Sequence, residues 1–133
     1  MKRLGNVLLT LVFVVCGFTA SAQTLQILVS FNGTNGEEPI GLTLGNDGNF
    51  YGTAEWGGDN NDGTVFKITT NGLLTTLVSF SLTNGACPVA ALTIGNDGNF
   101  YGTTDNGGDT SLNNGYGYGT IFQVTTNGML TAR

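Results

Sequence analysis

The sequence predicts an all-β protein built from two four-stranded antiparallel blades of the β-propeller type. Three observations predict this class. The nine residues Gly45–Thr53 (GNDGNFYGT) recur letter for letter at Gly95–Thr103. Short runs rich in β-branched and aromatic residues are separated by Asn-Gly and Asp-Gly turn signals. No stretch after residue 22 shows a helical period, and the 22 glycines of the chain disfavour helix.

Two further matches set the length of the repeat. Gly63–Thr75 (GTVFKITTNGLLT) matches Gly119–Thr131 (GTIFQVTTNGMLT), and Leu28–Phe31 (LVSF) matches Leu77–Phe80. With the first match, the offsets are 50, 56 and 49 residues, so one unit has about fifty residues. Most of the length difference is an insertion near Thr110–Tyr118. A catalytic loop is needed once, whereas a packing unit is rebuilt wherever it stacks, so the repetition indicates stacked blades.

The first unit predicts four strands joined by tight turns. We expect strands over Ile40–Leu44, Asn49–Thr53, Thr64–Thr69 and Leu73–Phe80. The Asn71-Gly72 dipeptide predicts a type I′ hairpin turn, and we expect Asp47 to hold its own turn through its side chain. The predicted turn positions of the two units are Asp47, Gly48, Asn71, Gly72, Asp97, Gly98, Asn127 and Gly128.

Several of these strands carry apolar side chains on both faces. Phe50 and Tyr51 point to opposite sides, and Val65 lies opposite Phe66 and Ile68. A sheet that faces water on one side alternates cleanly, whereas a sheet covered on both sides need not. Four-stranded units packed face to face with copies of themselves are the blades of a propeller.

The stretch LTLGNDGNFYGTAEWGG, followed by GTVFKITTNGLLTTLVSF, resembles the GloVer (Gloeobacter–Verrucomicrobia) repeat of choice-of-anchor tandem-repeat proteins. Its Asp-Gly-Asn-aromatic-x-Gly-Thr core is also similar to two-component-regulator propeller repeats. The resemblance covers nearly all of the chain after residue 22. It implies a propeller-type repeat protein that is exported and displayed at a surface, with no established activity.

The N-terminus predicts export. Lys2 and Arg3 precede the apolar run Val7–Phe18, and Ala20-Ser21-Ala22 is a small-residue cleavage site, so we expect residues 1–22 to be a signal peptide. Lipidation at Cys16 is the alternative. The predicted repeat domain covers residues 23–133, with an N-terminal strand over 24–31, repeat one over 40–80 and repeat two over 90–133. The expected location is extracellular, at the cell surface or in the periplasm.

The charge of the processed chain limits its partners. Lys67 and Arg133 remain against nine acidic residues, which gives a net charge of −7. Nucleic acids and anionic membranes need a basic footprint. We therefore expect no nucleic-acid partner and no membrane insertion after signal cleavage.

The chain offers few groups for catalysis. It has no histidine, which removes Ser-His-Asp and Cys-His catalysis. Paired carboxylates can hydrolyse glycosides, and Glu37, Glu38 and Glu55 are candidates by residue type. They lie in or beside Gly/Asn-rich loops, where solvated charge is the favoured interpretation. We expect burial for Cys87 as a small apolar residue, with pairing between chains as the alternative.

Loops rich in glycine hold the candidate binding residues. Oxygen ligands for Ca²⁺ are conceivable there, although ordinary turn chemistry is favoured and we expect no cofactor; the residues are Asp59, Asp62, Asp105 and Asp109. The exposed aromatic residues Trp56, Tyr116 and Tyr118 are the candidate ligand contacts. Rings in such loops more often wedge between blades, but rings beside Asn and Asp also suit sugar faces and hydroxyl groups.

The ends of the chain predict self-association. Propellers have 4–8 blades, and this chain carries two. The second unit ends at Arg133, where Leu-Val-Ser-Phe should begin, whereas Leu25–Phe31 (LQILVSF) copies that outer strand at the other end. We expect Leu25–Phe31 to complete the C-terminal blade of another chain, because two blades cannot curve far enough to join their own ends. Head-to-tail rings of roughly two to four subunits would result.

The function predicted from these features is that of an exported, non-catalytic repeat protein that binds a glycan or a protein or has a structural role. A propeller-type glycosidase or lyase is one alternative. A truncated piece of a longer repeat protein, without activity of its own, is the other.

Overall fold

A computed structural model describes residues 24–132 of the chain. The fold is all β, with two four-stranded antiparallel sheets, as the sequence predicts. We call the sheet of β1 to β4 blade 1 and the sheet of β5 to β8 blade 2. The predicted signal peptide (residues 1–22) and Cys16 lie outside the described residues.

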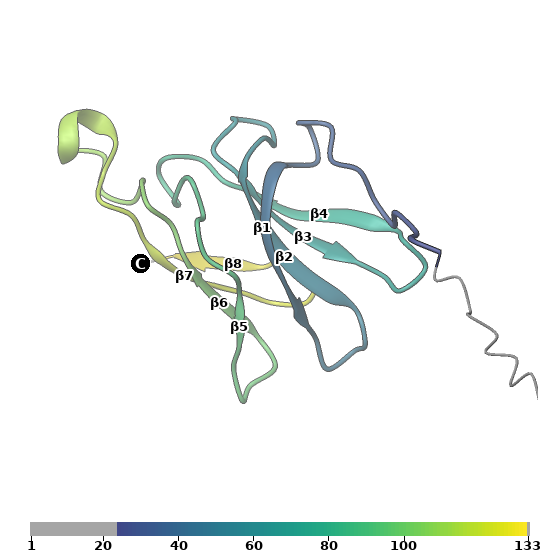
Figure 1. Ribbon diagram of the computed structural model, residues 1–133. Coiled ribbons are helices and arrows are strands. Elements are labelled where there is room, and N and C mark those ends of the chain that lie inside the picture. The colour runs from purple at the N-terminus through teal and green to yellow at the C-terminus, as the bar shows by residue number, and fades with distance from the viewer. Residues whose placement is uncertain (1–23, 133) are drawn as a thin grey trace, which may run out of the picture.

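Blade 1 is a meander in which each strand pairs with the next one along the chain (Figure 1). Its strands are β1 (Glu37–Leu44), β2 (Phe50–Trp56), β3 (Thr64–Ile68) and β4 (Leu74–Ser79). Two strands are longer than the sequence predicts. β1 begins at Glu37 and β2 continues to Trp56, because these two residues pair across the ladder.

Blade 2 repeats this order with shorter strands. They are β5 (Thr93–Ile94), β6 (Phe100–Thr103), β7 (Ile121–Val124) and β8 (Leu130–Ala132). The register is the same, since Tyr101 lies opposite Gln123 as Tyr51 lies opposite Lys67. The short 3-10 helix η1 (Asn113–Gly115) lies within the predicted insertion, in the loop between β6 and β7.

The hairpin between β3 and β4 is not the predicted type I′ turn. In this turn only Gly72 has a positive φ, 88°, and its amide donates to the Thr69 carbonyl at 2.9 Å. A type I′ turn needs positive φ at both central residues. The loop is instead a type I turn followed by a glycine bulge. The Thr69 hydroxyl fixes this longer loop by accepting the Leu73 amide at 3.0 Å.

The side chains of blade 1 alternate between its two faces as the sequence predicts. Tyr51 and Val65 belong to the larger hydrophobic cluster on one face, and Phe66 and Ile68 belong to the smaller cluster on the other. Phe50 packs at the edge of the smaller cluster. Both faces are therefore apolar, as expected for a blade that is covered on both sides.

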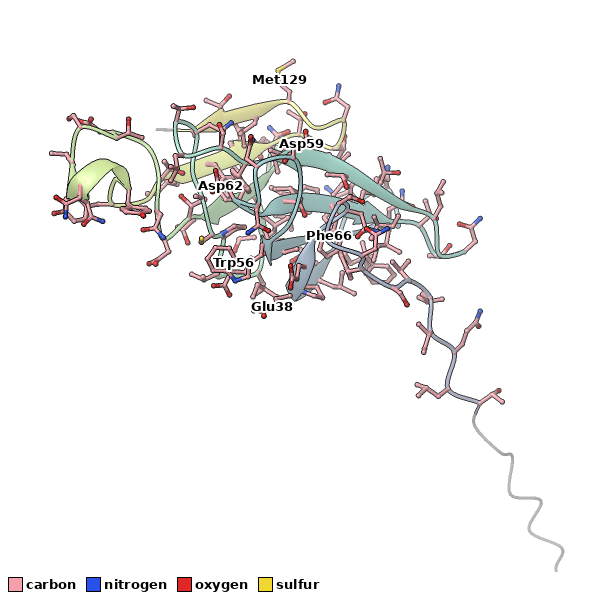
Figure 2. All side chains as sticks on the ribbon, turned by 90° about the horizontal axis from the view of Figure 1, so that it is seen from above. Glu38, Trp56, Asp59, Asp62, Phe66 and Met129 are labelled. Atoms are coloured by element: carbon pink, nitrogen blue, oxygen red, sulfur yellow. The ribbon has the colours of Figure 1, made fainter. Side chains whose placement is uncertain are left out.

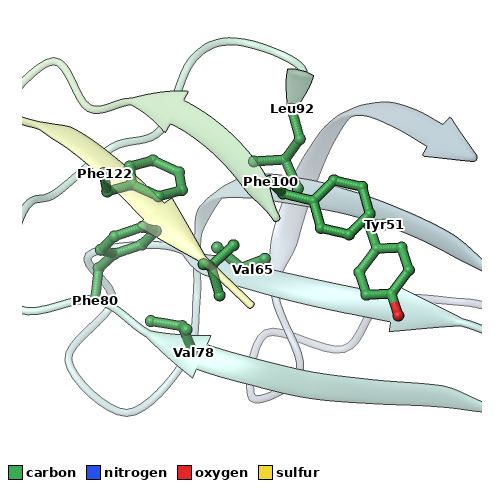
Figure 3. Close-up of a cluster of buried hydrophobic side chains, with 8 residues drawn as sticks. Tyr51, Val65, Val78, Phe80, Leu92, Phe100 and Phe122 are labelled. Carbon is green, nitrogen blue, oxygen red and sulfur yellow. The ribbon is translucent and has the colours of Figure 1, made fainter. Parts of the chain in front are cut away.

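The larger hydrophobic cluster lies between the two blades (Figure 3). Each repeat contributes four buried side chains to it: Tyr51, Val65, Val78 and Phe80 from the first, and Leu92, Phe100, Phe122 and Val124 from the second. Tyr51 stacks on Phe100 with ring centroids 4.1 Å apart. An aromatic pair of this kind adds about 0.5–1.5 kcal/mol beyond the area that it buries. The blades thus share one core.

Two threonine side chains add polar contacts between the blades. The Thr43 hydroxyl donates to the Leu92 carbonyl at 2.6 Å, and the Thr53 hydroxyl donates to the Ala90 carbonyl at 2.9 Å. Both carbonyls belong to the segment that leads into β5. These bonds fix the position of blade 2 along the strands of blade 1.

The N-terminal segment, residues 24–32, forms no strand within the chain. Val29 and Phe31 pack instead on the outer face of blade 1, where the Phe31 ring meets the Phe66 ring edge-on at 4.9 Å. The strand predicted over residues 24–31 finds no partner here because β4 already holds the outer position of blade 1.

Nothing in residues 24–132 forms a helix with the length and apolar character needed to span a membrane.

Candidate functional site

Trp56 is the last residue of β2, where the chain enters the loop of residues 57–63, and it is labelled in Figure 2. Its side chain is half-buried, and it pairs with Glu37 in the ladder. The loop is held by its own groups. The Gly57 amide donates to Asn61 Oδ1 at 3.1 Å, and the Gly63 amide donates to the Gly57 carbonyl at 3.1 Å. Trp56 thus lies at the base of a loop whose backbone is held by hydrogen bonds.

Tyr116 and Tyr118 lie in the longer loop between β6 and β7. They are 60% and 74% exposed. Backbone bonds hold this loop as well, because the Gly107 amide donates to the Tyr116 carbonyl at 2.7 Å and Asn113 Nδ2 donates to the Gly117 carbonyl at 2.8 Å. The two rings therefore project into solvent from a backbone that is already ordered.

The structure does not join the three candidate aromatic residues into one cluster. Trp56 is the last residue of β2 in blade 1, whereas Tyr116 and Tyr118 belong to the insertion of blade 2. Among the described residues, no aromatic contact links Trp56 to either tyrosine. Each loop therefore presents its own surface.

The candidate acids lie at the same end of blade 1. Glu37 and Glu38 are exposed at the start of β1, and Glu55 is half-buried near the end of β2. Glu38 has a positive φ of 55°. Over residues 24–132, no three side chains of His, Cys, Asp or Glu converge to hold a metal ion.

The four aspartates considered for Ca²⁺ take part in loop hydrogen bonds. The Asp59 amide donates to Ser79 Oγ at 2.7 Å, and the Asp62 carbonyl accepts the Cys87 amide at 2.9 Å. The Asp105 amide donates to the Cys87 carbonyl at 3.0 Å. The Asp109 carboxylate accepts the amide and the hydroxyl of Ser111, at 3.0 and 2.6 Å, and these bonds lower the pKa of Asp109. Of these bonds, only those of Asp109 involve a carboxylate, and no three such side chains of the described residues converge on a common point.

Cys87 is buried and free, at 6% exposure, between the loops of the two blades. Burial raises the pKa of its thiol, and the acids Glu55, Asp62 and Asp105 act in the same direction. The thiolate is the reactive form of cysteine. This thiol therefore serves as a small apolar group in the packing.

The turn aspartates each organise a small polar network. The Asp47 carboxylate accepts the Asn49 amide at 3.1 Å, the Tyr51 hydroxyl at 2.8 Å and Lys67 Nζ at 3.1 Å. Bonds from Asn49 hold the pKa of Asp47 well below its usual range, with the Tyr51 and Lys67 bonds adding to the effect. Burial, helped by Asp47, raises the pKa of Tyr51.

Asp97 has the same arrangement in the second repeat. It accepts the Asn99 amide at 3.1 Å and the Tyr101 hydroxyl at 2.8 Å. Gln123 Nε2, at 3.2 Å, takes the place of Lys67. The Asn99 bonds lower the pKa of Asp97. These networks fix the hairpin turns, and their groups are already paired.

The structure also exposes two apolar areas that the sequence analysis did not identify. One is a groove of about 500 Å³ on the outer face of blade 1, between the N-terminal segment and the sheet; six of its lining residues are Val29, Phe31, Leu42, Phe50, Phe66 and Ile68. The other is the far face of blade 2, where Tyr101 and Ile121 are 37% and 68% exposed. The sequence repeat could have revealed both areas, because their residues are equivalent to residues of the other repeat that are buried between the blades.

Stacked meanders with a shared core, order β1 to β4 and then β5 to β8, define a blade-type β-repeat protein. The family model described as the Gloeobacter/Verrucomicrobia repeat matches residues 14–132. The chain therefore belongs to the Gloeobacter/Verrucomicrobia repeat family, as its two repeat motifs suggest. No curated protein and no solved structure matches the chain.

Proposed function

We propose that this repeat protein is an exported, non-catalytic binding module of the cell surface, the extracellular space or the periplasm, and that its ligand is a carbohydrate. The membership of a repeat family supports a role in which the chain presents a surface. The basic, apolar and small-residue pattern of residues 1–22 supports export.

The observation that carries the binding proposal is the β6–β7 loop. Tyr116 and Tyr118 are largely exposed, although the backbone on both sides of them is fixed by hydrogen bonds. Rigid exposed rings offer contact area at a low cost in conformational entropy. Asn114 is close to them in the sequence and offers an amide group for hydroxyls, whereas Asn113 Nδ2 already donates to the Gly117 carbonyl. A flat ring next to amide donors and acceptors suits the face of a sugar.

A direct test is binding of the purified chain to a glycan array, followed by calorimetry with the strongest ligand. Tyr116→Ala and Tyr118→Ala should each weaken binding by about tenfold, which corresponds to about 1.4 kcal/mol. Leu112→Ala is the matched control, because Leu112 is 46% exposed in the same loop and lacks a polar ring. Binding that survives loss of both tyrosines, or binding to proteins only, would contradict the proposal.

A propeller-type glycosidase or lyase remains the alternative function. It would need two acids that face one substrate, and Glu38 and Glu55 are the two residues between the paired positions Glu37↔Trp56 and Pro39↔Ala54. Turnover on a panel of polysaccharides that is abolished by Glu55→Gln would establish this alternative against the binding proposal.

Export has its own test. The chain is produced with its own N-terminus in a host that secretes proteins, and the product is sequenced from its first residue. A product that begins at Gln23 supports export. A product found inside the cell with Lys2 and Arg3 still present contradicts it.

A further inference from the structure

The contact between the two blades shows how one repeat of this chain covers another. Tyr51 and Val65 of blade 1 are fully buried, at 0% exposure, because blade 2 lies over them. On the blade 2 side, the Phe100 ring receives Tyr51 in a stack (Figure 3). This internal contact is head-to-tail, since the two blades use opposite faces.

The far face of blade 2 presents the same groups as the face of blade 1 that is already covered. Tyr101 is equivalent to Tyr51, and Ile121 is equivalent to Val65. Thr93 and Thr103 are exposed there, at the positions of the threonines that donate to blade 2 within the chain.

The groove on blade 1 presents the same groups as the covered face of blade 2. Its Leu42, Phe50, Phe66 and Ile68 are the equivalents, in order, of four side chains in the shared core: Leu92, Phe100, Phe122 and Val124. The groove therefore carries side chains equivalent to those on the face of blade 2 that packs against blade 1.

The N-terminal segment packs in this groove in the same way as the end of the first repeat packs on blade 2. The Phe31 and Phe66 rings are 4.9 Å apart at 64°, and the equivalent rings of Phe80 and Phe122 are 5.1 Å apart at 65°. A Cβ on Gly72 would lie 2.8 Å from the Leu28 carbonyl oxygen. A Cβ on the equivalent Gly128 would lie 2.8 Å from the Leu77 carbonyl oxygen. Leu28–Phe31 thus packs on blade 1 as Leu77–Phe80 packs on blade 2.

Of the four side chains that the first repeat adds to the contact between the blades, Val78 and Phe80 have equivalents in the groove, but Tyr51 and Val65 do not. Tyr101 and Ile121 of a second copy would fill these two positions. We propose that the groove of blade 1 binds the far face of blade 2 of a second copy of this chain, in a head-to-tail contact that repeats the one between the blades. Tyr101 then stacks on Phe50 as Tyr51 stacks on Phe100.

The strand edges agree with this arrangement. In blade 1, β4 pairs with β3 at Val65↔Val78 and Thr64↔Ser79. In blade 2, the described part of β8 pairs with β7 at Phe122↔Ala132, Gln123↔Thr131 and Val124↔Leu130. By the repeat, Val29 and Ser30 of the copy that carries the groove lie opposite Ile121 and Thr120 of the second copy. In the proposed contact, this N-terminal segment, which forms no strand within its own chain, lies beside the outer strand of the neighbouring blade.

The first measurement is the mass of the full chain in solution at micromolar concentration, by light scattering. Cyclic closure of the contact predicts a discrete assembly of roughly two to four chains. A folded monomer would overturn the proposal.

Variants at exposed positions identify the surface. Ile121→Asp should weaken association by at least about 100-fold, because it places an unpaired charge in an apolar contact. Met129→Asp is the matched control, since Met129 is 67% exposed and lies in the turn between β7 and β8. If Ile121→Asp destroys the circular dichroism signal of the sheets, Thr103→Arg on the same face replaces it. Equal masses for the face variant and the control would overturn the proposal.

A mixing experiment tests the head-to-tail character. Leu42→Asp blocks the groove, where Leu42 is 58% exposed, and Ile121→Asp blocks the opposite face. Each variant alone should be a monomer. A mixture of the two retains one intact groove and one intact face, so it should form one-to-one dimers and nothing larger. A mixture that stays monomeric would contradict the contact.

Discussion

Tyr51 and Tyr101 occupy the same place in two identical nine-residue stretches, but Tyr51 is fully buried and Tyr101 is 37% exposed. The preceding phenylalanines show the reverse. Phe100 is fully buried, whereas Phe50 is half-buried beside a groove. The local sequence therefore determines that a hairpin forms, and the position of the adjacent blade determines which face of the hairpin is buried. Within residues 24–132, blade 1 has no neighbouring blade on one side, and blade 2 has none on the opposite side.

The largest expected difference between the blades is at these phenylalanines. Phe100→Ala removes a buried ring from the shared core and should lower the free energy of unfolding by about 3–5 kcal/mol. Phe50→Ala removes a half-buried ring and should cost about 1–2 kcal/mol. Urea unfolding in the Ile121→Asp background measures both without a contribution from association. Equal losses would mean that the two faces are covered alike.

The glycines that follow the tyrosines should behave more similarly, because their contacts lie within one blade. A Cβ on Gly102 would lie 2.4 Å from Cζ of Phe122. A Cβ on Gly52 would lie 2.5 Å from Cζ of Phe66 and 2.2 Å from the Gly41 carbonyl oxygen. Overpacking of this kind costs about 1–3 kcal/mol. We expect Gly52→Ala to be the more costly, since a backbone oxygen yields less than a ring. Thermal unfolding of the two variants decides this, and a larger loss for Gly102→Ala would contradict it.

The turn aspartates predict a loss of stability in acid. The pKa values of Asp47 and Asp97 are lowered in the folded chain, chiefly by bonds from Asn49 and Asn99. Their contribution is therefore present above the unfolded pKa of about 3.9 and is lost as the pH falls through the folded values. Urea midpoints should decrease below about pH 4, and the double variant Asp47→Asn with Asp97→Asn should show a flatter profile. An unchanged profile would contradict the networks.

The smallest expected effect concerns the residue that distinguishes the two networks. Lys67→Gln gives blade 1 the side chain of blade 2 and removes the ion pair with Asp47, at 3.1 Å. Both side chains are partly exposed, so the change should cost about 0.2–1 kcal/mol and less at high salt. A loss well above this range would show that the pair is more important than its exposure indicates.

The sequence predicts the two blades well because local signals specify them. The repeated motif, the Asp-Gly and Asn-Gly turns and the opposed Phe50 and Tyr51 all act within a hairpin. The type I′ prediction failed at Asn71-Gly72, because the Thr69 hydroxyl favours a loop with one more residue. The dipeptide alone does not contain that contact.

The candidate site was less predictable. Sequence composition marks Tyr116 and Tyr118 as loop aromatics, but only the backbone bonds of Gly107 and Asn113 show that the loop is ordered. The groove could not be predicted from the sequence either, because it depends on where Phe31 packs and not on any motif. Its likeness to the covered face of blade 2 requires both faces to be compared in space.

The central claim is that Tyr101 and Phe50 cover each other between copies as Tyr51 and Phe100 do within one. Hydroxyl-radical labelling of the three tyrosines Tyr51, Tyr101 and Tyr116, read by mass spectrometry over a dilution series, tests it directly. Labelling of Tyr101 should decrease toward that of Tyr51 as the concentration rises, with Tyr116 unchanged as the internal reference, and Ile121→Asp should abolish the protection. Labelling of Tyr101 that is the same at every concentration, in a chain that remains folded, would contradict the claim.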